Sequence, residues 1–292
     1  MYLYRRVNQQ KIVPMNSFIK KLENRWQQKK YVCVGLDSDF SKIPQSIKKS
    51  NSIKDVLFKF NKGIIDQTAG LVCAFKINPA FYEAEGLEGL EGLKKTVKYI
   101  NKKYPDIPLI LDAKKGDIGN TNLGYTKSIF DDLGFDAVTV NPYLGGESLQ
   151  PFLDRKDKGI IVLVKTSNPG AGEFQDLLVS GKPLYKVVAK NVANGWNKYG
   201  NCGVVVGATY LKELKDVRKI VGDMPILIPG IGTQGGNLKN TIQNGKGKKS
   251  WGMIINSSRG IIFADNPRKA TLDLHQQITN VIARSDSDEA IL

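Results

Sequence analysis

Histidine is almost absent from this chain, and its scarcity excludes several familiar active sites. The 292 residues include one histidine, His275, in a segment of helical spacing near the end of the chain. A Ser-His-Asp or Cys-His nucleophile needs a histidine beside the reacting residue, and His/Cys metal sites need several such ligands. The sequence therefore argues against both kinds of site, and we expect His275 to be a surface or packing residue.

Cysteine is scarce as well. The three residues, Cys33, Cys73 and Cys202, are far apart, and each lies in or beside an apolar run. This spacing fits neither a disulfide framework nor a zinc site. We expect all three to be buried in a protein that works in a reducing compartment.

Long apolar runs are also missing. No segment approaches the ~18 apolar residues that a membrane helix requires, and the first residues lack the apolar core of a secretory signal. We therefore expect a cytoplasmic protein without a membrane-spanning segment. Residues 1–15 are expected to form a flexible or added arm, and residues 284–292 (RSDSDEAIL) a disordered acidic tail.

Positive charge predominates, with 43 Lys and Arg against 28 Asp and Glu and a formal net charge of +15. Lysine is spread over the whole length, however, and no basic-aromatic motif of a nucleic-acid-binding module is present. This pattern is typical of a lysine-rich surface, so nucleic acid is not expected as a partner. A positive field would favour an anionic small-molecule substrate.

Eight short apolar runs recur along the chain: 31–37, 71–78, 108–114, 136–143, 159–166, 202–208, 225–230 and 252–258. Segments with helical spacing lie between them, for example 53–70, 183–200 and 210–222. Short continuous apolar strands that alternate with helices indicate a parallel sheet covered by helices. Eight such units predict an α/β fold, a single (β/α)8 TIM barrel over residues 16–283. A doubly wound open sheet is the alternative, but polar residues after nearly every strand favour the barrel.

Charged residues follow the first three runs, at the strand ends where a barrel of this kind builds its active site. Asp112 and Lys114 share a face of the third strand because side chains alternate. Asp117 lies on the next loop, from which it can reach the same mouth or a neighbouring subunit. Lys76 lies just before the end of the second run, and Asp37 ends the first. Such carboxylates and ammonium groups keep each other charged, and the whole set predicts a catalytic array.

The last two strands are followed by residues suited to an anion. PGIGTQGG (229–236) is a glycine-rich loop after the seventh strand, and SSRGI (257–261) follows the eighth. Loops at these two positions commonly hold a phosphate in this fold. Glycine amides, a helix N-terminus and the planar guanidinium of Arg259 all suit that ligand.

These motifs resemble those of the orotidine 5′-phosphate decarboxylases. The segment 112–117 (DAKKGD) is similar to the Asp-x-Lys-x-x-Asp signature of that family, and DAKKGDIGNT resembles its bacterial-type branch with longer chains. The similarity spans roughly residues 16–275 and includes GLDSD, FKINPAFYE, VTVNPYLGGES, VKTSNPGAGEFQD and PGIGTQGG. It implies conversion of orotidine 5′-phosphate to uridine 5′-phosphate (UMP) and CO₂, the last step of UMP biosynthesis, without a metal or an organic cofactor.

The resemblance also implies roles for single residues. Lys114 would stabilise the carbanion at C6 of the pyrimidine and protonate it, and Asp112 would lie near the substrate carboxylate. Lys76 would bridge Asp112 and the ribose, whose hydroxyls Asp37 would contact. Ser167 would bind the pyrimidine amide edge. The phosphate would be held by Gln234 and Arg259, with backbone help from Gly232, Gly235 and Gly260.

A homodimer is implied too. Asp117, with Ile118 and Thr121 nearby, would enter the site of the partner subunit. One departure from the family concerns the order around Arg259, which is Ser-Arg-Gly here and Gly-Arg in shorter members. That departure leaves the backbone donors beside the phosphate open.

Three alternatives stay open at this stage. Sugar-phosphate decarboxylases and hexulose-phosphate synthases share a similar Asp-x-Lys-x-x-Asp but use it around Mg²⁺, which the cation of Lys76 would repel. A Schiff-base aldolase could use Lys114, although flanking carboxylates should keep that lysine protonated and poorly nucleophilic. A non-catalytic phosphate-binding or nucleic-acid-binding protein is the third, although binding alone does not need the aspartates beside the lysines.

Overall fold

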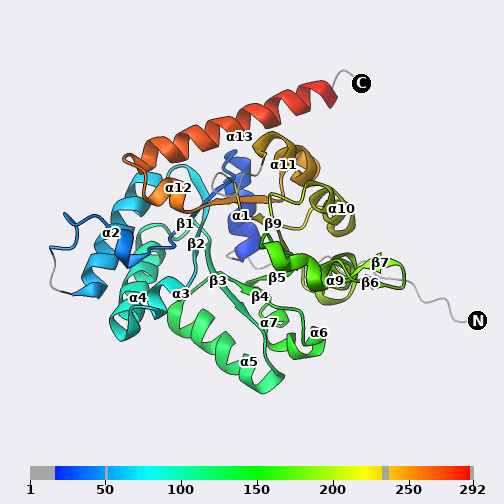
Figure 1. Cartoon of the computed structure of the whole chain (residues 1–292), viewed down its shortest axis with the longest axis horizontal. Helices are drawn as coiled ribbons and strands as arrows, with labels where there is room; N and C mark the ends of the chain where they lie inside the picture. Colours follow the sequence, from blue (N-terminus) through cyan, green and yellow to red (C-terminus); the bar gives the residue numbers. More distant parts are fainter. Residues whose placement is uncertain (1–16, 50–51, 232–236, 290–292) are drawn as a thin grey trace, which may run out of the picture.

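The eight apolar runs form a closed barrel of parallel strands (Figure 1). The computed structural model describes residues 17–49, 52–231 and 237–289, and the barrel strands are β1 (Val32–Gly35), β2 (Val72–Ile77), β3 (Leu109–Lys115), β4 (Ala137–Val140), β5 (Gly159–Lys165), β8 (Cys202–Val206), β9 (Ile226–Ile228) and β10 (Met253–Ser257). The ring closes where Val32 of β1 pairs with Ile255 of β10. This closure confirms the predicted TIM barrel, and the alternative of a doubly wound open sheet is wrong.

Helices connect the strands and cover the outside of the barrel. The longer ones are α2 (Ile53–Thr68), α4 (Gly86–Lys103), α5 (Gly119–Thr126) continued by η2 (Lys127–Leu133), α9 (Leu184–Asn191) continued by η4 (Val192–Trp196), α10 (Leu211–Val221), α11 (Leu238–Gly245) and α13 (Pro267–Glu289). Apolar residues at helical spacing face inward, as Leu214 and Val217 do in α10. The helices predicted within 53–70, 183–200 and 210–222 are confirmed.

Helix α1 (Phe18–Gln27) covers the end of the barrel at which the strands begin. The indole of Trp26 donates a hydrogen bond of 2.9 Å to the carbonyl of Met253, the first residue of β10. The guanidinium of Arg25 donates one of 2.8 Å to the carbonyl of Val72, the first residue of β2. These bonds satisfy carbonyls at the strand starts, and they leave the opposite end, where the strands finish, for the site.

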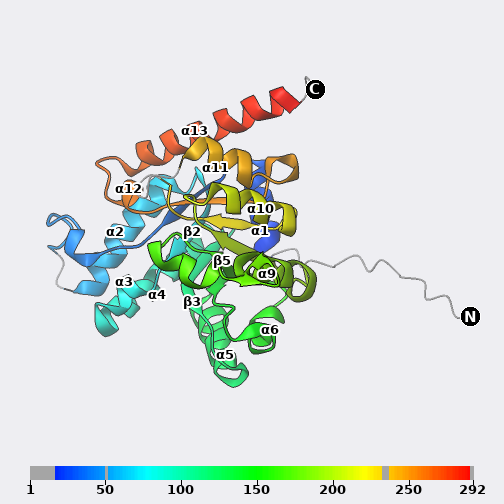
Figure 2. The ribbon, with the colours of Figure 1, turned by 45° about the vertical axis from the view of Figure 1, so that its right-hand side comes forward.

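Shorter elements follow the strand ends: α3 (Ala80–Glu83), α6 (Gly145–Ser148), α7 (Gln150–Leu153), α12 (Arg259–Ile262) and η1 (Phe40–Lys42). A further one, η5 (Lys248–Ser250), precedes β10. Between β5 and α9 the chain makes a longer detour over residues 166–183, here called the β5 excursion. It contains η3 (Pro169–Ala171), α8 (Gly172–Gln175) and an antiparallel hairpin of β6 (Leu178–Val179) and β7 (Lys182–Pro183). Figure 1 labels β6 and β7 beside α9, and Figure 2 shows helix α5 from a second side.

The chain ends differ in part from the sequence prediction. Helix α13 continues to Glu289, so residues 284–289 are helical where the sequence indicated a disordered acidic tail. A helix satisfies its own backbone hydrogen bonds and can therefore extend beyond its last apolar contact. The predicted arm at residues 1–15, and residues 290–292, lie outside the described part of the chain.

The scarce residue types lie where the sequence placed them. Cys33, Cys73 and Cys202 are buried in strands of the barrel. His275 lies on α13, partly buried and away from the strand ends. Within residues 17–49, 52–231 and 237–289, no helix combines the length and apolar character needed to cross a membrane.

Candidate active site

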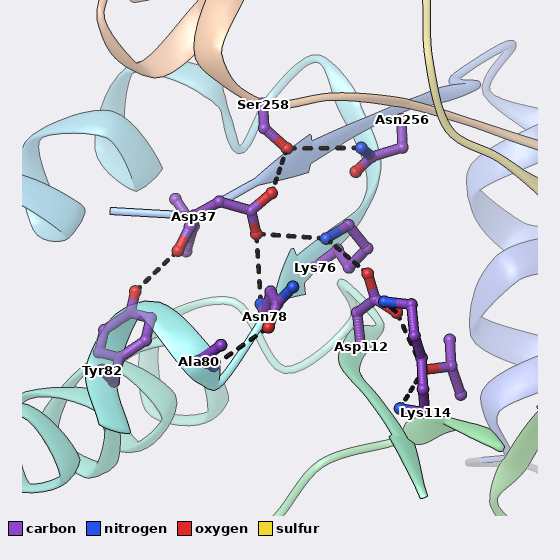
Figure 3. A network of polar contacts seen from close by, with 11 residues as sticks. Asp37, Lys76, Asn78, Ala80, Tyr82, Asp112, Lys114, Asn256 and Ser258 are labelled. Atoms are coloured by element: carbon purple, nitrogen blue, oxygen red, sulfur yellow. Dashed lines mark hydrogen bonds and ion pairs between the residues drawn. The ribbon is translucent and has the colours of Figure 1, made fainter. Parts of the chain in front are cut away.

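Four charged side chains meet at the mouth of the barrel (Figure 3). Lys76, at the end of β2, is 3% exposed, and its Nζ lies 3.2 Å from Asp37 Oδ1 and 3.2 Å from Asp112 Oδ2. The Nζ of Lys114 lies 2.9 Å from Asp112 Oδ1. The side chains therefore form an alternating array, Asp37–Lys76–Asp112–Lys114, from three adjacent strand ends. The structure thus brings four of the predicted residues together, and their catalytic roles stay predictions.

Opposite charges keep the two inner members of the array, Lys76 and Asp112, ionised. Burial alone would raise the pKa of the Asp112 carboxyl, but the ammonium groups of Lys76 and Lys114 outweigh it and lower that pKa to about 2. Burial alone would lower the pKa of Lys76, but Asp37 and Asp112 raise it above its usual value. The site therefore holds fixed charges of both signs at neutral pH.

The ionised Asp112 makes stability depend on pH. Because its pKa is about 2 in the folded protein against an ordinary value of 3.8, its stabilising effect is complete above about pH 4 and is lost as the pH falls towards 2. The lowered pKa contributes about 2 kcal/mol to the free energy of unfolding at neutral pH. Urea unfolding should show that the gap in stability between the wild type and Asp112→Asn narrows by about 1 kcal/mol from pH 6 to pH 3. An unchanged gap would contradict this account.

Lys114 reaches the array through an irregular stretch of β3. Its φ is +49°, in the left-handed region, and the pairing of β3 with β4 shifts between Leu111 and Lys115. Thr139 on β4 accepts a 2.9 Å hydrogen bond from the Lys114 N–H and donates one of 2.9 Å to Asp112 Oδ1. Simple side-chain alternation therefore predicted that Lys114 lies near Asp112, but it did not include the irregular backbone that brings them together. A left-handed conformation costs a residue with a side chain about 1 kcal/mol or more, and such strain is concentrated at functional sites.

Asp37 is held by groups that the sequence analysis did not assign. The hydroxyl of Ser258 donates a 2.7 Å hydrogen bond to Asp37 Oδ2, and the N–H of Asn78 donates one of 3.2 Å to Oδ1. Gly35 permits this approach, because a Cβ there would lie 1.9 Å from Ser258 Oγ. Two polar residues in the sequence could have pointed to these contacts. Ser258 directly follows β10, and Thr139 interrupts the apolar run of β4.

A cavity of about 380 Å³ adjoins the array. Its lining also includes Gly230, Ile231 and Arg259, which follow β9 and β10 as the phosphate prediction requires. Arg259 begins α12 with an exposed side chain, and Gly260 is exposed beside it. The other residues predicted to hold phosphate, Gly232, Gln234 and Gly235, lie outside the described residues.

Ser167 also lines this cavity, together with its neighbours Thr166 and Asn168. These residues follow β5. Leu163, Val205 and Leu227 supply apolar surface on the inside of the barrel. The cavity thus combines a charged end, an apolar base and a polar edge. This combination suits a flat polar ring with an anionic substituent.

Asp117, Ile118 and Thr121 are not among the residues that line the cavity of their own chain. They lie at the start of α5, where Asp117 Oδ1 accepts a 2.7 Å hydrogen bond from the N–H of Ile118. Ile118 is 63% exposed, and Thr121 is exposed too. The structure therefore does not bring Asp117 into the array with the other two predicted carboxylates.

Fold and site together define a (β/α)8-barrel protein with a lysine–aspartate array at the strand ends and a cavity bordered by an arginine. In the part of the chain that the structure describes, no cluster of three His, Cys, Asp or Glu residues forms a metal-binding group. The family described as "Orotidine 5'-phosphate decarboxylase / HUMPS family" matches residues 30–274, and the chain belongs to this family.

Relatives of the chain agree with this assignment. A protein of Janthinobacterium sp. (strain Marseille) named orotidine 5′-phosphate decarboxylase is 47% identical over 275 residues, which cover 91% of this chain and 100% of the relative. The relative of the same name from Cellvibrio japonicus is 45% identical over 270 residues, covering 90% and 98%.

Solved structures are similar as well. The Leishmania donovani OMP decarboxylase has a TM-score of 0.81 at 36% identity, covering 91% of this chain and 98% of that one. The UMP synthase of the same organism has a TM-score of 0.83 at 38% identity. That match covers 91% of this chain and 56% of the UMP synthase chain, so this chain spans a little over half of that protein's length.

Proposed function

We propose that this protein decarboxylates orotidine 5′-phosphate to UMP and CO₂, the last step of UMP biosynthesis, without a metal or an organic cofactor. The observation that carries the proposal is the array, in which Lys114 Nζ lies 2.9 Å from Asp112 and Lys76 Nζ lies 3.2 Å from both Asp112 and Asp37. Family membership and the names of the relatives support the same reaction.

The reaction needs a cation beside one carbon atom. When the bond between C6 and the carboxylate breaks, CO₂ leaves and the electron pair stays on C6. The ammonium group of Lys114, held in place by Asp112, stabilises this charge as it develops. It then transfers a proton to C6, which gives UMP, and the neutral lysine regains a proton from solvent. With 47% of its side chain exposed, Lys114 can reach such a ligand, while Lys76 at 3% is a fixed charge.

Ultraviolet absorbance tests the reaction directly. Orotidine 5′-phosphate is added to the purified protein in the presence of EDTA, and the spectrum is expected to change to that of UMP. The expected independence from metal follows from Lys76, whose ammonium lies between the two carboxylates that a divalent cation would need. A folded protein that leaves the spectrum unchanged would contradict the proposal. It would favour a Mg²⁺-dependent sugar-phosphate enzyme or a binding role.

Arg259 is proposed to bind the phosphate, since it follows β10 and lines the same cavity as the array. Arg259→Ala should weaken UMP binding about 10- to 100-fold, the usual range for charge-assisted hydrogen bonds, and leave uridine binding nearly unchanged. Calorimetric titration of both ligands measures the two effects. Arg268→Ala is the matched control, because Arg268 is an exposed arginine on α13. Equal weakening of UMP and uridine would refute the phosphate role.

Two copies of the chain are proposed to share their sites. Asp117 and Thr121 lie outside the cavity of their own chain, at the start of an α5 that exposes Ile118 by 63% and Leu123 by 57%. Leu87, next to α5, is 82% exposed. So much exposed apolar surface is typical of a protein interface. A second copy seated on this face would cover it and could receive Asp117, Ile118 and Thr121 at its own cavity.

A further inference from the structure

Lys165, the last residue of β5, carries a buried charge that the proposed reaction does not use. Its side chain is 0% exposed, and its Nζ lies 2.6 Å from Asp176 Oδ1. The same Nζ lies 4.5 Å from the ring centroid of Tyr210 and 5.9 Å from that of Tyr185. Lys165 is not among the residues that line the cavity. Removing an ammonium group from water costs several kcal/mol unless a partner compensates it, and Asp176 is the partner that supplies a full opposite charge.

Asp176 is not buried in return. Its side chain is 50% exposed, and the residue follows α8 in the β5 excursion. The buried member of the pair therefore belongs to the barrel, and the exposed member belongs to the excursion. This asymmetry makes the ion pair an anchor, because the excursion must keep Asp176 in place to satisfy Lys165.

The residues next to this ion pair, Thr166 and Gln175, also contact each other. Gln175 accepts a 2.9 Å hydrogen bond from the N–H of Thr166 at its Oε1 and donates one of 2.8 Å from its Nε2 to Thr166 Oγ1. Two consecutive residues at the end of β5 thus bind two consecutive residues at the end of α8. The residue that follows them is Ser167, which lines the cavity.

Ser167 is confined from the other side by Gly207, which follows β8. The N–H of Gly207 donates a 2.8 Å hydrogen bond to the carbonyl of Lys165. A Cβ at Gly207 would lie 2.8 Å from Ser167 Cβ and 3.0 Å from its Cα, closer than real Cβ contacts. The backbone of Ser167 therefore packs directly on this glycine. It is fixed between the end of β8 and the clamp formed by Gln175 and Asp176.

We propose that Lys165 is a positioning residue for substrate recognition: through its ion pair with Asp176 it fixes the turn 166–168, and with it the position of Ser167 at the pyrimidine end of the cavity. The proposal rests on the proposed function, in which Ser167 contacts the pyrimidine. Its consequence is selective. Loss of the pair disturbs recognition of the base and leaves recognition of the ribose phosphate intact, because Arg259 lies on a different strand end.

The test compares two inhibitors of decarboxylation, UMP and ribose 5-phosphate, on Asp176→Asn and on Lys165→Met. In both variants, inhibition by UMP should weaken about tenfold or more while inhibition by ribose 5-phosphate stays unchanged. The KM for orotidine 5′-phosphate should rise by a similar factor. Asp176→Glu, which keeps the charge, should recover most of the UMP affinity. Lys165→Met leaves only the exposed carboxylate of Asp176 without its partner, and water can solvate that group. This variant therefore tests the positioning role even if Asp176→Asn does not fold.

Asp131→Asn is the matched control, because it breaks the ion pair between Asp131 and Arg155. The side chain of Asp131 is 52% exposed, close to the 50% of Asp176. Asp131→Asn should leave inhibition by UMP and by ribose 5-phosphate unchanged. Unchanged UMP inhibition in Asp176→Asn and Lys165→Met would overturn the proposal, as would equal weakening of both inhibitors. Failure of the proposed function is distinguishable, since the wild type itself would then leave orotidine 5′-phosphate unchanged.

Gly207 offers an independent test of the route through Ser167. Gly207→Ala should displace Ser167 without touching the ion pair, and should also weaken UMP inhibition about tenfold without affecting ribose 5-phosphate. Gly63→Ala is its control, because a Cβ at Gly63 meets nothing within 4 Å. Normal UMP inhibition in Gly207→Ala would refute the role assigned to Ser167 in the proposal.

Discussion

Lys114→Ala is expected to abolish measurable decarboxylation while leaving UMP binding measurable. Lys114 is the cation of the array that is both exposed enough to reach a ligand, at 47%, and held by a carboxylate, at 2.9 Å from Asp112. Its removal takes away the charge that stabilises the carbanion and the proton that ends the reaction. Each of these contributions is commonly worth a factor of 100 or more, so a loss of roughly 10⁴-fold or more in kcat is expected.

The measurement is the absorbance assay for turnover together with calorimetric titration of UMP. Lys62→Ala is a closely matched control, because Lys62 is 46% exposed, is paired with Asp66 at 2.7 Å within α2, and does not line the cavity. That variant should keep wild-type turnover. Near-normal turnover in Lys114→Ala would exclude the lysine as the proton donor and require another group at the mouth.

Mixing two inactive variants is expected to restore activity. If Asp117 serves the site of its partner, Lys114→Ala and Asp117→Asn homodimers both lack a complete site. A mixed dimer pairs the intact Lys114 of one chain with the intact Asp117 of the other, and therefore contains one complete site. Random pairing makes half of the dimers mixed, so about one quarter of the wild-type sites should be recovered.

The experiment co-refolds equal amounts of the two variants and follows turnover by absorbance. Its control mixes Lys114→Ala with Asp112→Asn, two residues of one array on a single chain, 2.9 Å apart between their charged atoms. In that mixture each site still lacks one member of the array, so no recovery is expected. Recovery confined to the first mixture would support the shared site, and its absence would refute the role of Asp117 in the partner's site.

The sequence predicted the positions of the eight barrel strands well. Continuous apolar runs are stable only where both faces of a strand are buried, and a barrel covered by helices supplies such burial. Strand ends are equally visible, because the change from apolar to charged residues marks them. Lys76 and Asp112 were therefore placed at the mouth correctly.

Backbone irregularity was beyond the reach of the sequence. The left-handed φ of Lys114 and the shifted pairing of β3 depend on the hydrogen bond from its N–H to Thr139, a residue 25 positions away. Strict alternation assumed a regular strand. Ser258 was missed for the same kind of reason, since its bond to Asp37 joins residues 221 positions apart.

By itself, then, the sequence determined the barrel, the array at its mouth and the family resemblance, because each depends on local patterns of apolar and charged residues. Only the tertiary structure decided that Lys165 is buried and paired with Asp176, that Ser167 packs on Gly207, and that Asp117 lies outside its own cavity. The physical reason is that a buried charge, a close backbone contact and the direction of a loop are set by which strands and turns become neighbours when the ring closes.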